Sequence, residues 1–169
     1  MVFEFCTQKL HIMKKISILL LFLVPLALVS FKMADQKEEL KWESWNTGYE
    51  KGKKEKKIIL IDAYTEWCGW CKKMDRDTYT NADVIKKINE HFVPVKFNPE
   101  LDQKYMIDGK EVSGFELLGL LSQNNRTGYP TTFFLVTTKN TVYIEPGYQN
   151  AEKFLVTLDN MIAQQSKQP

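Results

Sequence analysis

The chain has 169 residues, with 23 Lys and Arg against 21 Asp and Glu, and it has three cysteines. That length suits one compact domain, and a formal net charge of +2 is too close to zero for a protein that binds nucleic acid through a basic face. Three cysteines are too few for a disulfide-stapled small scaffold or for an all-cysteine zinc site. The positions of the cysteines, rather than their number, therefore carry the information about function.

An apolar run near the N-terminus is typical of an export signal. Residues 16–29 (ISILLLFLVPLALV) hold about 14 uncharged positions, short of the roughly 20 that a membrane-spanning helix needs. Lys14 and Lys15 precede the run and supply the positive charge expected of a signal peptide. Met13 is an alternative start, which would leave Cys6 outside the protein. A buried helix of the domain is the alternative interpretation of the run.

We divide the chain into residues 1–34, an N-terminal extension with a signal peptide or anchor, and residues 35–169, a single domain. No clean small-residue cleavage motif follows the apolar run, so removal of the signal and its retention as an anchor both stay open. We expect a periplasmic or other extracytoplasmic location. The domain would be soluble after cleavage or anchored to the membrane by its N-terminus.

The domain begins with helical and strand patterns in alternation. Residues 35–50 space their apolar side chains for a short amphipathic helix, and the basic run 51–57 (KGKKEKK) is typical of a solvated loop. Residues 58–63 (IILIDA) form a short apolar run, as expected for a central strand covered on both faces. A turn and a helix over residues 68–77 follow.

The alternation continues to the end of the chain. Asn81 is a candidate N-cap for a second helix, which leads into a strand over residues 92–97 that is parallel to the first if the crossover is right-handed. Further helices are predicted at 115–121 and 151–164, and a hairpin of strands is predicted at 131–137 and 141–144. This order predicts an α/β fold, a three-layer α/β/α sandwich with a central mixed sheet.

The candidate chemistry lies in the segment Cys68-Gly69-Trp70-Cys71. Two cysteines three residues apart, at the start of a helix that follows a buried strand, can form and break a disulfide. The unpaired N–H groups and partial positive charge of the helix N-terminus favour a thiolate at Cys68, the predicted nucleophile. Cys71 lies one turn inside the helix and is expected to be less exposed, suited to resolve a mixed disulfide. Gly69 leaves the backbone open to a partner chain.

This segment has two alternative interpretations. Half of a zinc site would need two further ligands, but the other cysteine and the two histidines are Cys6, His11 and His91, the first two on the signal side. A purely structural disulfide would add little stability, because the loop that it closes is so short. We therefore expect a redox dithiol, with no metal and no cofactor.

Two segments together resemble the thioredoxin family. Residues 60–71 (LIDAYTEWCGWC) resemble its active-site strand and turn, and residues 128–131 (GYPT) resemble its cis-proline loop. The resemblance spans about residues 42–162 and implies the thioredoxin fold for essentially the whole domain. Residues 67–81 and 88–98 are similar to exported bacterial thioredoxin-like proteins, among them the C-terminal domain of DsbD-type transmembrane reductases.

The resemblance implies roles for two charged residues. Asp62 matches the buried carboxylate below the dithiol and would accept the proton of Cys71 during resolution. Lys96 matches the lysine that partners this carboxylate. The alternatives are a polar residue at a strand end for Asp62 and an ordinary strand lysine that reaches solvent for Lys96.

The resemblance also implies a surface for the substrate. Pro130 would be the cis-proline beside the sulfurs and would leave the backbone of Tyr129 free to pair with an extended substrate strand. Gly147 would let the substrate approach, and Trp67 would shield the site. A trans-proline at a strand start, a turn glycine and a core tryptophan are the respective alternatives. Trp70 departs from the proline of thioredoxin itself and adds an aromatic side chain at the mouth of the site.

As a function, the resemblance implies an exported thiol–disulfide oxidoreductase that reduces protein disulfides. Its partners would be disulfide-containing proteins and an upstream electron-donor protein, in the membrane or outside it, and the protein would be a monomer that binds no nucleic acid. A thiol oxidase or isomerase, a cytochrome-maturation thioredoxin and a thioredoxin-like chaperone or binding module stay open as alternatives. Residues 100–125 form a longer segment than the matching part of minimal thioredoxins. This segment would either determine the choice of partner or be a loop without a functional role.

Overall fold

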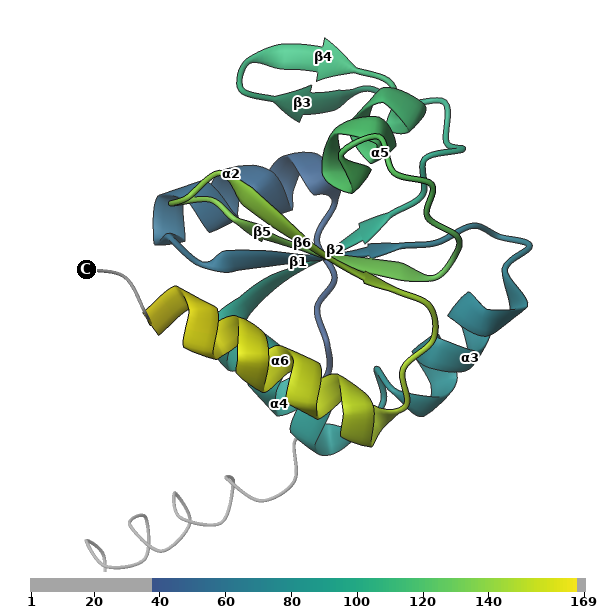
Figure 1. The fold of residues 1–169 in the computed structure, drawn as a ribbon, viewed down its shortest axis with the longest axis vertical. Coiled ribbons are helices and arrows are strands. Elements are labelled where there is room, and N and C mark those ends of the chain that lie inside the picture. Colours follow the sequence, from purple (N-terminus) through teal and green to yellow (C-terminus); the bar gives the residue numbers. More distant parts are fainter. Residues whose placement is uncertain (1–37, 167–169) are drawn as a thin grey trace, which may run out of the picture. The chain divides into compact units, whose positions relative to one another are not determined.

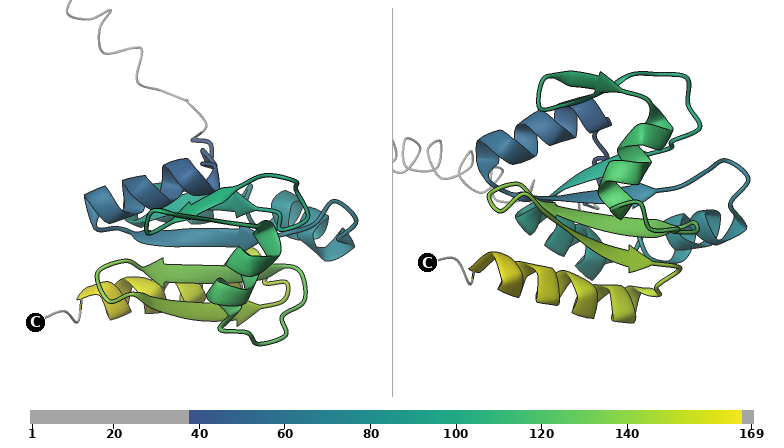
Figure 2. Two further views of the ribbon diagram at one scale, coloured as in Figure 1. Left: turned by 90° about the horizontal axis from the view of Figure 1, so that it is seen from above. Right: turned by 45° about the horizontal axis from the view of Figure 1, so that its top comes forward.

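The computed structural model describes residues 38–166, and a four-stranded mixed sheet lies at its centre (Figure 1). The strands lie in the order β2 (Phe92–Phe97), β1 (Ile58–Ala63), β5 (Thr131–Val136) and β6 (Thr141–Pro146). Helices pack on both faces of this sheet (Figure 2). The predicted three-layer α/β/α sandwich with a mixed sheet is therefore confirmed.

Strand β1 is the element that positions the candidate site. It runs parallel to β2 with Asp62 opposite Lys96, and antiparallel to β5 with Asp62 opposite Thr132. All of its residues are buried, as expected for an apolar run that is covered on both faces. The sequence thus places one carboxylate, that of Asp62, in a strand that is otherwise apolar.

One face of the sheet is covered by α2 (Trp45–Glu55), α5 (Gly114–Ser122) and a hairpin of two short strands, β3 (Tyr105–Ile107) and β4 (Lys110–Val112). Ile59, Ile61 and Ala63 of β1 point to this face. Their spacing follows from the alternation of side chains along a strand.

The other face is covered by α3 (Gly69–Asp77), α4 (Ala82–His91) and α6 (Ala151–Ser166), and Figure 1 shows α4 beside α6 on this side. The predicted N-cap of α4 is confirmed, because the side chain of Asn81 accepts hydrogen bonds from the backbone N–H groups of the first turn. The same alternation along β1 turns Leu60 toward these helices.

Helix α2 differs from the prediction at both ends. It begins at Trp45, where Ser44 is the N-cap, and it continues to Glu55 through most of the basic run that was expected to be a loop. The reason is the close packing of its buried side on the sheet: a Cβ atom at Gly48 would lie 2.3 Å from Val95, and one at Gly52 would lie 2.4 Å from Ile59. Glycine disfavours a helix when the sequence is considered alone. In the fold, these two glycines form the side of the helix that packs against β1 and β2.

The hairpin of β3 and β4 is not predicted from the sequence. Asp108 and Gly109 form its turn, with positive φ angles of 47° and 76°. The hairpin is held on α2 by hydrogen bonds, because the Trp45 indole donates to the Met106 carbonyl at 2.8 Å and the Met106 N–H donates to Asn46 at 2.8 Å. Strands of three residues are too short for a sequence pattern to reveal.

No helix within residues 38–166 is long and apolar enough to cross a membrane. The predicted signal or anchor in residues 1–34, with Cys6 and the alternative start at Met13, lies outside the described residues.

Candidate active site

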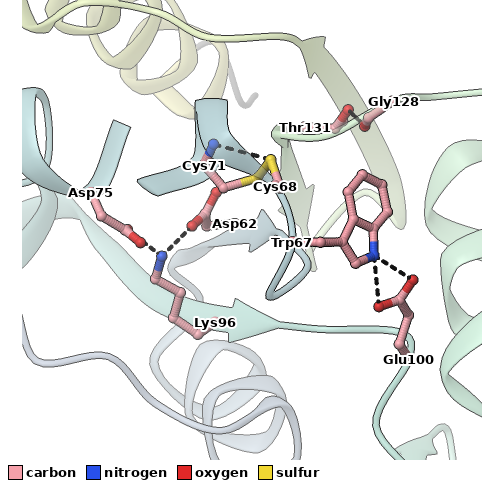
Figure 3. Close-up of a disulfide and its surroundings, with 9 residues drawn as sticks. All are labelled: Asp62, Trp67, Cys68, Cys71, Asp75, Lys96, Glu100, Gly128 and Thr131. Atoms are coloured by element: carbon pink, nitrogen blue, oxygen red, sulfur yellow. Dashed lines mark hydrogen bonds and ion pairs between the residues drawn. A yellow bond between two sulfur atoms is a disulfide. The ribbon is translucent and has the colours of Figure 1, made fainter. Parts of the chain in front are cut away.

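The two cysteines lie where β1 leads into α3, and they form a disulfide (Figure 3). The sulfur atoms are 2.05 Å apart and the Cα atoms 5.3 Å apart. Cys68 is the N-cap of α3, and its sulfur accepts a hydrogen bond of 3.0 Å from the backbone N–H of Cys71. The predicted helix start is therefore confirmed, and the first sulfur lies at the positive end of the helix dipole.

The two cysteines do not differ in exposure as the sequence led us to expect. Cys68 is 4% exposed and Cys71 is 3% exposed, because the sulfur of Cys68 folds back onto the first turn of α3. Gly69 and Trp70 between them are exposed, and a Cβ atom at Gly69 would meet nothing within 4 Å. The space over Gly69 is therefore open.

Asp62 and Lys96 form an ion pair beneath the disulfide. The Lys96 ammonium lies 2.5 Å from Oδ2 of Asp62 and also pairs with Asp75 of α3. The side chains become more exposed along this series, from 2% for Asp62 through 22% for Lys96 to 44% for Asp75. In Figure 3 the Asp62 carboxyl group lies between Lys96 and Cys71. The series therefore connects a buried carboxyl group to solvent.

The two charged groups of the pair have shifted pKa values. Burial raises the pKa of Asp62, and the nearby Lys96 opposes this only in part. Burial lowers the pKa of Lys96, but the carboxylates of Asp62 and Asp75 outweigh it and raise that pKa above its ordinary value. Asp62 is thus a carboxyl group that can take up a proton at a higher pH than an exposed aspartate.

Sequence reasoning missed the residues that complete the surroundings of Lys96. Its ammonium lies 4.8 Å from the ring centroid of Trp42, 5.0 Å from that of Tyr64 and 5.4 Å from that of Tyr79, distances typical of cation–π contacts. Asp75 carries a signal that could have been used, because it follows Cys71 by four residues and so lies on the same face of α3.

The two tryptophans near the disulfide are exposed and are not core residues. Trp67 is 67% exposed, and its indole N–H lies 3.1 Å from both carboxylate oxygens of Glu100. Its ring packs edge-on against Tyr129, with centroids 5.9 Å apart. Trp70 is 59% exposed and contacts Tyr148, with centroids 5.5 Å apart. Two exposed tryptophan side chains, each in contact with a tyrosine, therefore adjoin the Cys-X-X-Cys segment.

The loop before β5 lies at the same end of the sheet as the disulfide, because Thr131 pairs with Ala63, the last residue of β1. The peptide bond between Tyr129 and Pro130 is cis, and Pro130 is buried. Gly147 has a φ of 86°, a conformation that favours glycine, and its N–H donates to the Pro130 carbonyl at 2.8 Å. The structure thus brings Tyr129, Pro130 and Gly147 together.

Fold and site define a thioredoxin-fold protein with a Cys-X-X-Cys disulfide. The family model Thioredox_DsbH, described as "Protein of unknown function, DUF255", matches residues 28–166, and the chain belongs to this family.

Curated relatives match only a short part of the chain. Spermatogenesis-associated protein 20 of Rattus norvegicus is 31% identical over 70 residues, which are 38% of this chain and 9% of the relative. The Homo sapiens protein of the same name is 30% identical over 70 residues, with the same shares. The chain therefore spans less than a tenth of the length of these curated relatives.

Solved structures show the same fold over most of the chain. A thioredoxin from Thermus thermophilus has a TM-score of 0.58 at 16% identity, over 75% of this chain and 90% of that one. A protein described as DsbH oxidoreductase has a TM-score of 0.56 at 16% identity, over 79% and 92%. A putative disulphide-isomerase from Bacteroides thetaiotaomicron has a TM-score of 0.53 at 21% identity, over 80% and 99%. At these identities the likeness establishes the thioredoxin fold alone.

Proposed function

We propose that this protein is an exported thiol–disulfide oxidoreductase that reduces disulfides in other proteins. The observation that carries the proposal is the Cys68–Cys71 disulfide at the N-terminus of α3, above the buried ion pair of Asp62 and Lys96. A helix N-terminus favours a thiolate, and a buried carboxyl group with a raised pKa is suited to proton transfer.

In the first step, the reduced protein attacks its substrate. The thiolate of Cys68 forms a bond to one sulfur of the substrate disulfide, and the other substrate sulfur leaves as a thiolate that takes a proton from water. The N–H groups at the start of α3 stabilise the attacking charge. The product of this step is a mixed disulfide between Cys68 and the substrate.

In the second step, Cys71 resolves the mixed disulfide. Its thiol gives its proton to Asp62, and the resulting thiolate attacks the sulfur of Cys68 and expels the second substrate sulfur as a thiolate. Two electrons have then passed from the protein to the substrate, and the Cys68–Cys71 disulfide is the oxidised product. Lys96 balances the charge of Asp62 whenever this carboxyl group is ionised.

An extended substrate segment would lie along the loop of Tyr129 and Pro130, over Gly69, with Gly147 allowing its close approach. Trp67 and Trp70, both exposed, would contact the substrate on either side of its cysteine. This arrangement is supported by the position of the loop at the same sheet end as the disulfide and by the open space above Gly69.

We further propose that residues 1–34 direct the domain, residues 35–169, out of the cytoplasm, and that the protein belongs to an exported bacterial branch of the thioredoxin-like proteins. The support is the apolar run at 16–29 behind two lysines. A dithiol protein, in the membrane or outside it, would return the disulfide to the reduced state and close the cycle.

Trapping of the mixed disulfide tests the mechanism. In the full chain with Cys6→Ser as the matched background, Cys71→Ser should accumulate disulfide-linked partners, because the resolving thiol is missing. Cys68→Ser should accumulate none and should not reduce a model disulfide. Reduction by Cys68→Ser at the wild-type rate would overturn the proposal.

The reduction potential of the Cys68–Cys71 couple tests the direction of electron flow. A reductase is expected near roughly −270 mV, as in thioredoxin, whereas an oxidase is expected near roughly −120 mV. A value at the oxidising end would replace the proposed reductase with a thiol oxidase and would leave the dithiol chemistry in place.

A further inference from the structure

We propose that the hydroxyl group of Tyr79 donates a hydrogen bond to the second oxygen of Asp62, and that Tyr79 is thereby a positioning residue for proton transfer from Cys71. This inference rests on the proposed function for its consequence in turnover. The hydrogen bond itself is independent of that function.

Tyr79 lies just after α3 and is fixed by its neighbours. It is 5% exposed, and its ring packs edge-on against Trp42, at 4.9 Å, and against Phe154, at 5.5 Å. The Lys96 ammonium lies 5.4 Å from the same ring and 2.5 Å from Oδ2 of Asp62. One ammonium group thus contacts both the tyrosine ring and the carboxylate, which places the two side chains in one buried cluster.

Two polar atoms of this cluster lack a hydrogen-bond partner among residues 38–166. They are Oδ1 of Asp62 and the hydroxyl oxygen of Tyr79, and both are inaccessible to solvent. Buried polar groups in folded proteins are normally paired. A carboxylate can only accept and a phenol can donate, so the two unpaired atoms have complementary requirements.

The electrostatics of the cluster agree with this assignment. Burial and the charge of Asp62 raise the pKa of Tyr79 well above its ordinary value, so the phenol keeps its proton and remains a donor. Burial raises the pKa of Asp62, and a hydrogen bond from Tyr79 opposes this rise together with Lys96.

Each element around Asp62 contributes groups that bear on its titration. Strand β5 contributes Thr132, which does not titrate. The titratable and charged groups are Lys96 on β2, Cys71 and Asp75 on α3, Tyr64 after β1, and Tyr79 itself. Of these, Tyr79 is the neutral donor whose hydroxyl can be removed with its ring kept in place. Without this hydroxyl, less opposes the rise that burial causes in the pKa of Asp62. The carboxylate then forms only at a higher pH.

The test compares Tyr79→Phe with Tyr105→Phe. Tyr105 is the matched control, because it is equally buried but lies on the other face of the sheet, where its hydroxyl donates to the Asn98 carbonyl at 2.8 Å. Titration of the Asp62 carboxyl in the oxidised protein is followed by carbon NMR. We expect the midpoint to move to higher pH in Tyr79→Phe and to stay unchanged in Tyr105→Phe. An unchanged midpoint in a folded Tyr79→Phe would overturn the proposal.

A second measurement connects the hydrogen bond to turnover. The rate at which Cys71 resolves a preformed mixed disulfide should fall about tenfold at pH 7 in Tyr79→Phe and recover toward the wild-type rate at high pH. A purely structural role would instead lower the rate equally at every pH, which would overturn the positioning role. If the wild-type protein resolves no mixed disulfide while the NMR midpoint still shifts, the proposed function fails and the hydrogen bond stands.

A variant with 3,5-difluorotyrosine at position 79 keeps the test open if Tyr79→Phe does not fold. The fluorinated phenol is a stronger donor, so the Asp62 midpoint should move to lower pH, opposite to the shift in Tyr79→Phe. A midpoint that does not move in this variant would also overturn the proposal.

Discussion

The buried tyrosine and tryptophan side chains on the two faces of the sheet have different kinds of polar partner. On the face of α2 and the hairpin, the Trp45 indole donates to a backbone carbonyl, as does the Tyr105 hydroxyl, and the Tyr49 hydroxyl donates to Asp108, each at 2.8 Å. On the face of α3, the Tyr79 hydroxyl makes no contact of this kind within residues 38–166 and lies in the buried cluster of Asp62 and Lys96, where Oδ1 of Asp62 is the partner that we propose for it.

This difference separates hydrogen bonds that stabilise the fold from a buried cluster that we propose to serve proton transfer. An unpaired buried polar group costs about 1–3 kcal/mol, and on the face of α2 the fold avoids that cost for these three aromatic side chains. Beneath the disulfide it keeps a buried carboxyl group with a raised pKa, next to a lysine that also pairs with Asp75. Such departures from the local rules concentrate at functional sites.

The largest expected effect comes from removing the cation of the α3 face. Lys96→Met leaves Asp62 buried without its ion-pair partner, and breaking a buried pair from one side costs about 3–5 kcal/mol. The loss should be largest at alkaline pH, because at low pH Asp62 takes up a proton and no buried charge remains. Urea unfolding at pH 5 and pH 8 measures it.

The double variant of Lys96→Met with Asp62→Asn is the control for that prediction, because it removes both charges. It should recover most of the stability that Lys96→Met loses. A loss of the same size in the double variant would show that the aliphatic packing of Lys96, not its charge, supports this face.

The next largest effect on the free energy of unfolding is expected from close packing on the α2 face. Gly52→Ala would place a Cβ atom 2.4 Å from Ile59, and overpacking of this kind costs about 1–3 kcal/mol. Gly69→Ala is the matched control at the disulfide, where a Cβ atom would meet nothing within 4 Å, and it should change the free energy of unfolding by less than about 0.5 kcal/mol. Thermal unfolding of both variants in the oxidised state measures the two changes in stability. Equal losses would mean that the two regions are packed equally tightly.

Asp62→Asn should stabilise the oxidised protein by about 1–2 kcal/mol above neutral pH. Because the pKa of Asp62 is raised in the folded state, its contribution to stability is present below its unfolded pKa of about 3.9 and is lost as the pH rises through its folded pKa. Asparagine does not ionise, so the variant does not lose this stability as the pH rises. Its stability relative to the wild type should therefore show no gain at low pH, where Asp62 is protonated. A variant that is less stable than the wild type at pH 8 would show that the ion pair with Lys96 is net stabilising.

Much of this arrangement could be predicted from the sequence, because local patterns fix it. The apolar run of β1, the two cysteines at the start of α3 and the N-cap at Asn81 each depend on neighbouring residues. Asp62 and Lys96 could be paired only through the resemblance to thioredoxins, since their contact depends on the register of two strands.

The rest depends on contacts between distant segments. Trp42 and Tyr79 are far apart in the chain and meet only around Lys96, and no local pattern reveals such a cluster. The extent of α2 differs from the prediction because the basic run 51–57 has the composition of a solvated loop, whereas in the fold Gly48 and Gly52 allow the helix to approach the sheet closely.

The smallest effect on stability is expected at the exposed rim of the disulfide. Glu100→Gln weakens the contact to the Trp67 indole, whose N–H lies 3.1 Å from both carboxylate oxygens. Because Trp67 is 67% exposed, solvent replaces the lost interaction, and unfolding should change by less than about 0.5 kcal/mol. The indole is then held less firmly beside the disulfide, so KM for a protein substrate should rise about threefold with kcat unchanged. A loss above about 1.5 kcal/mol would instead place this contact with the stabilising hydrogen bonds of the α2 face.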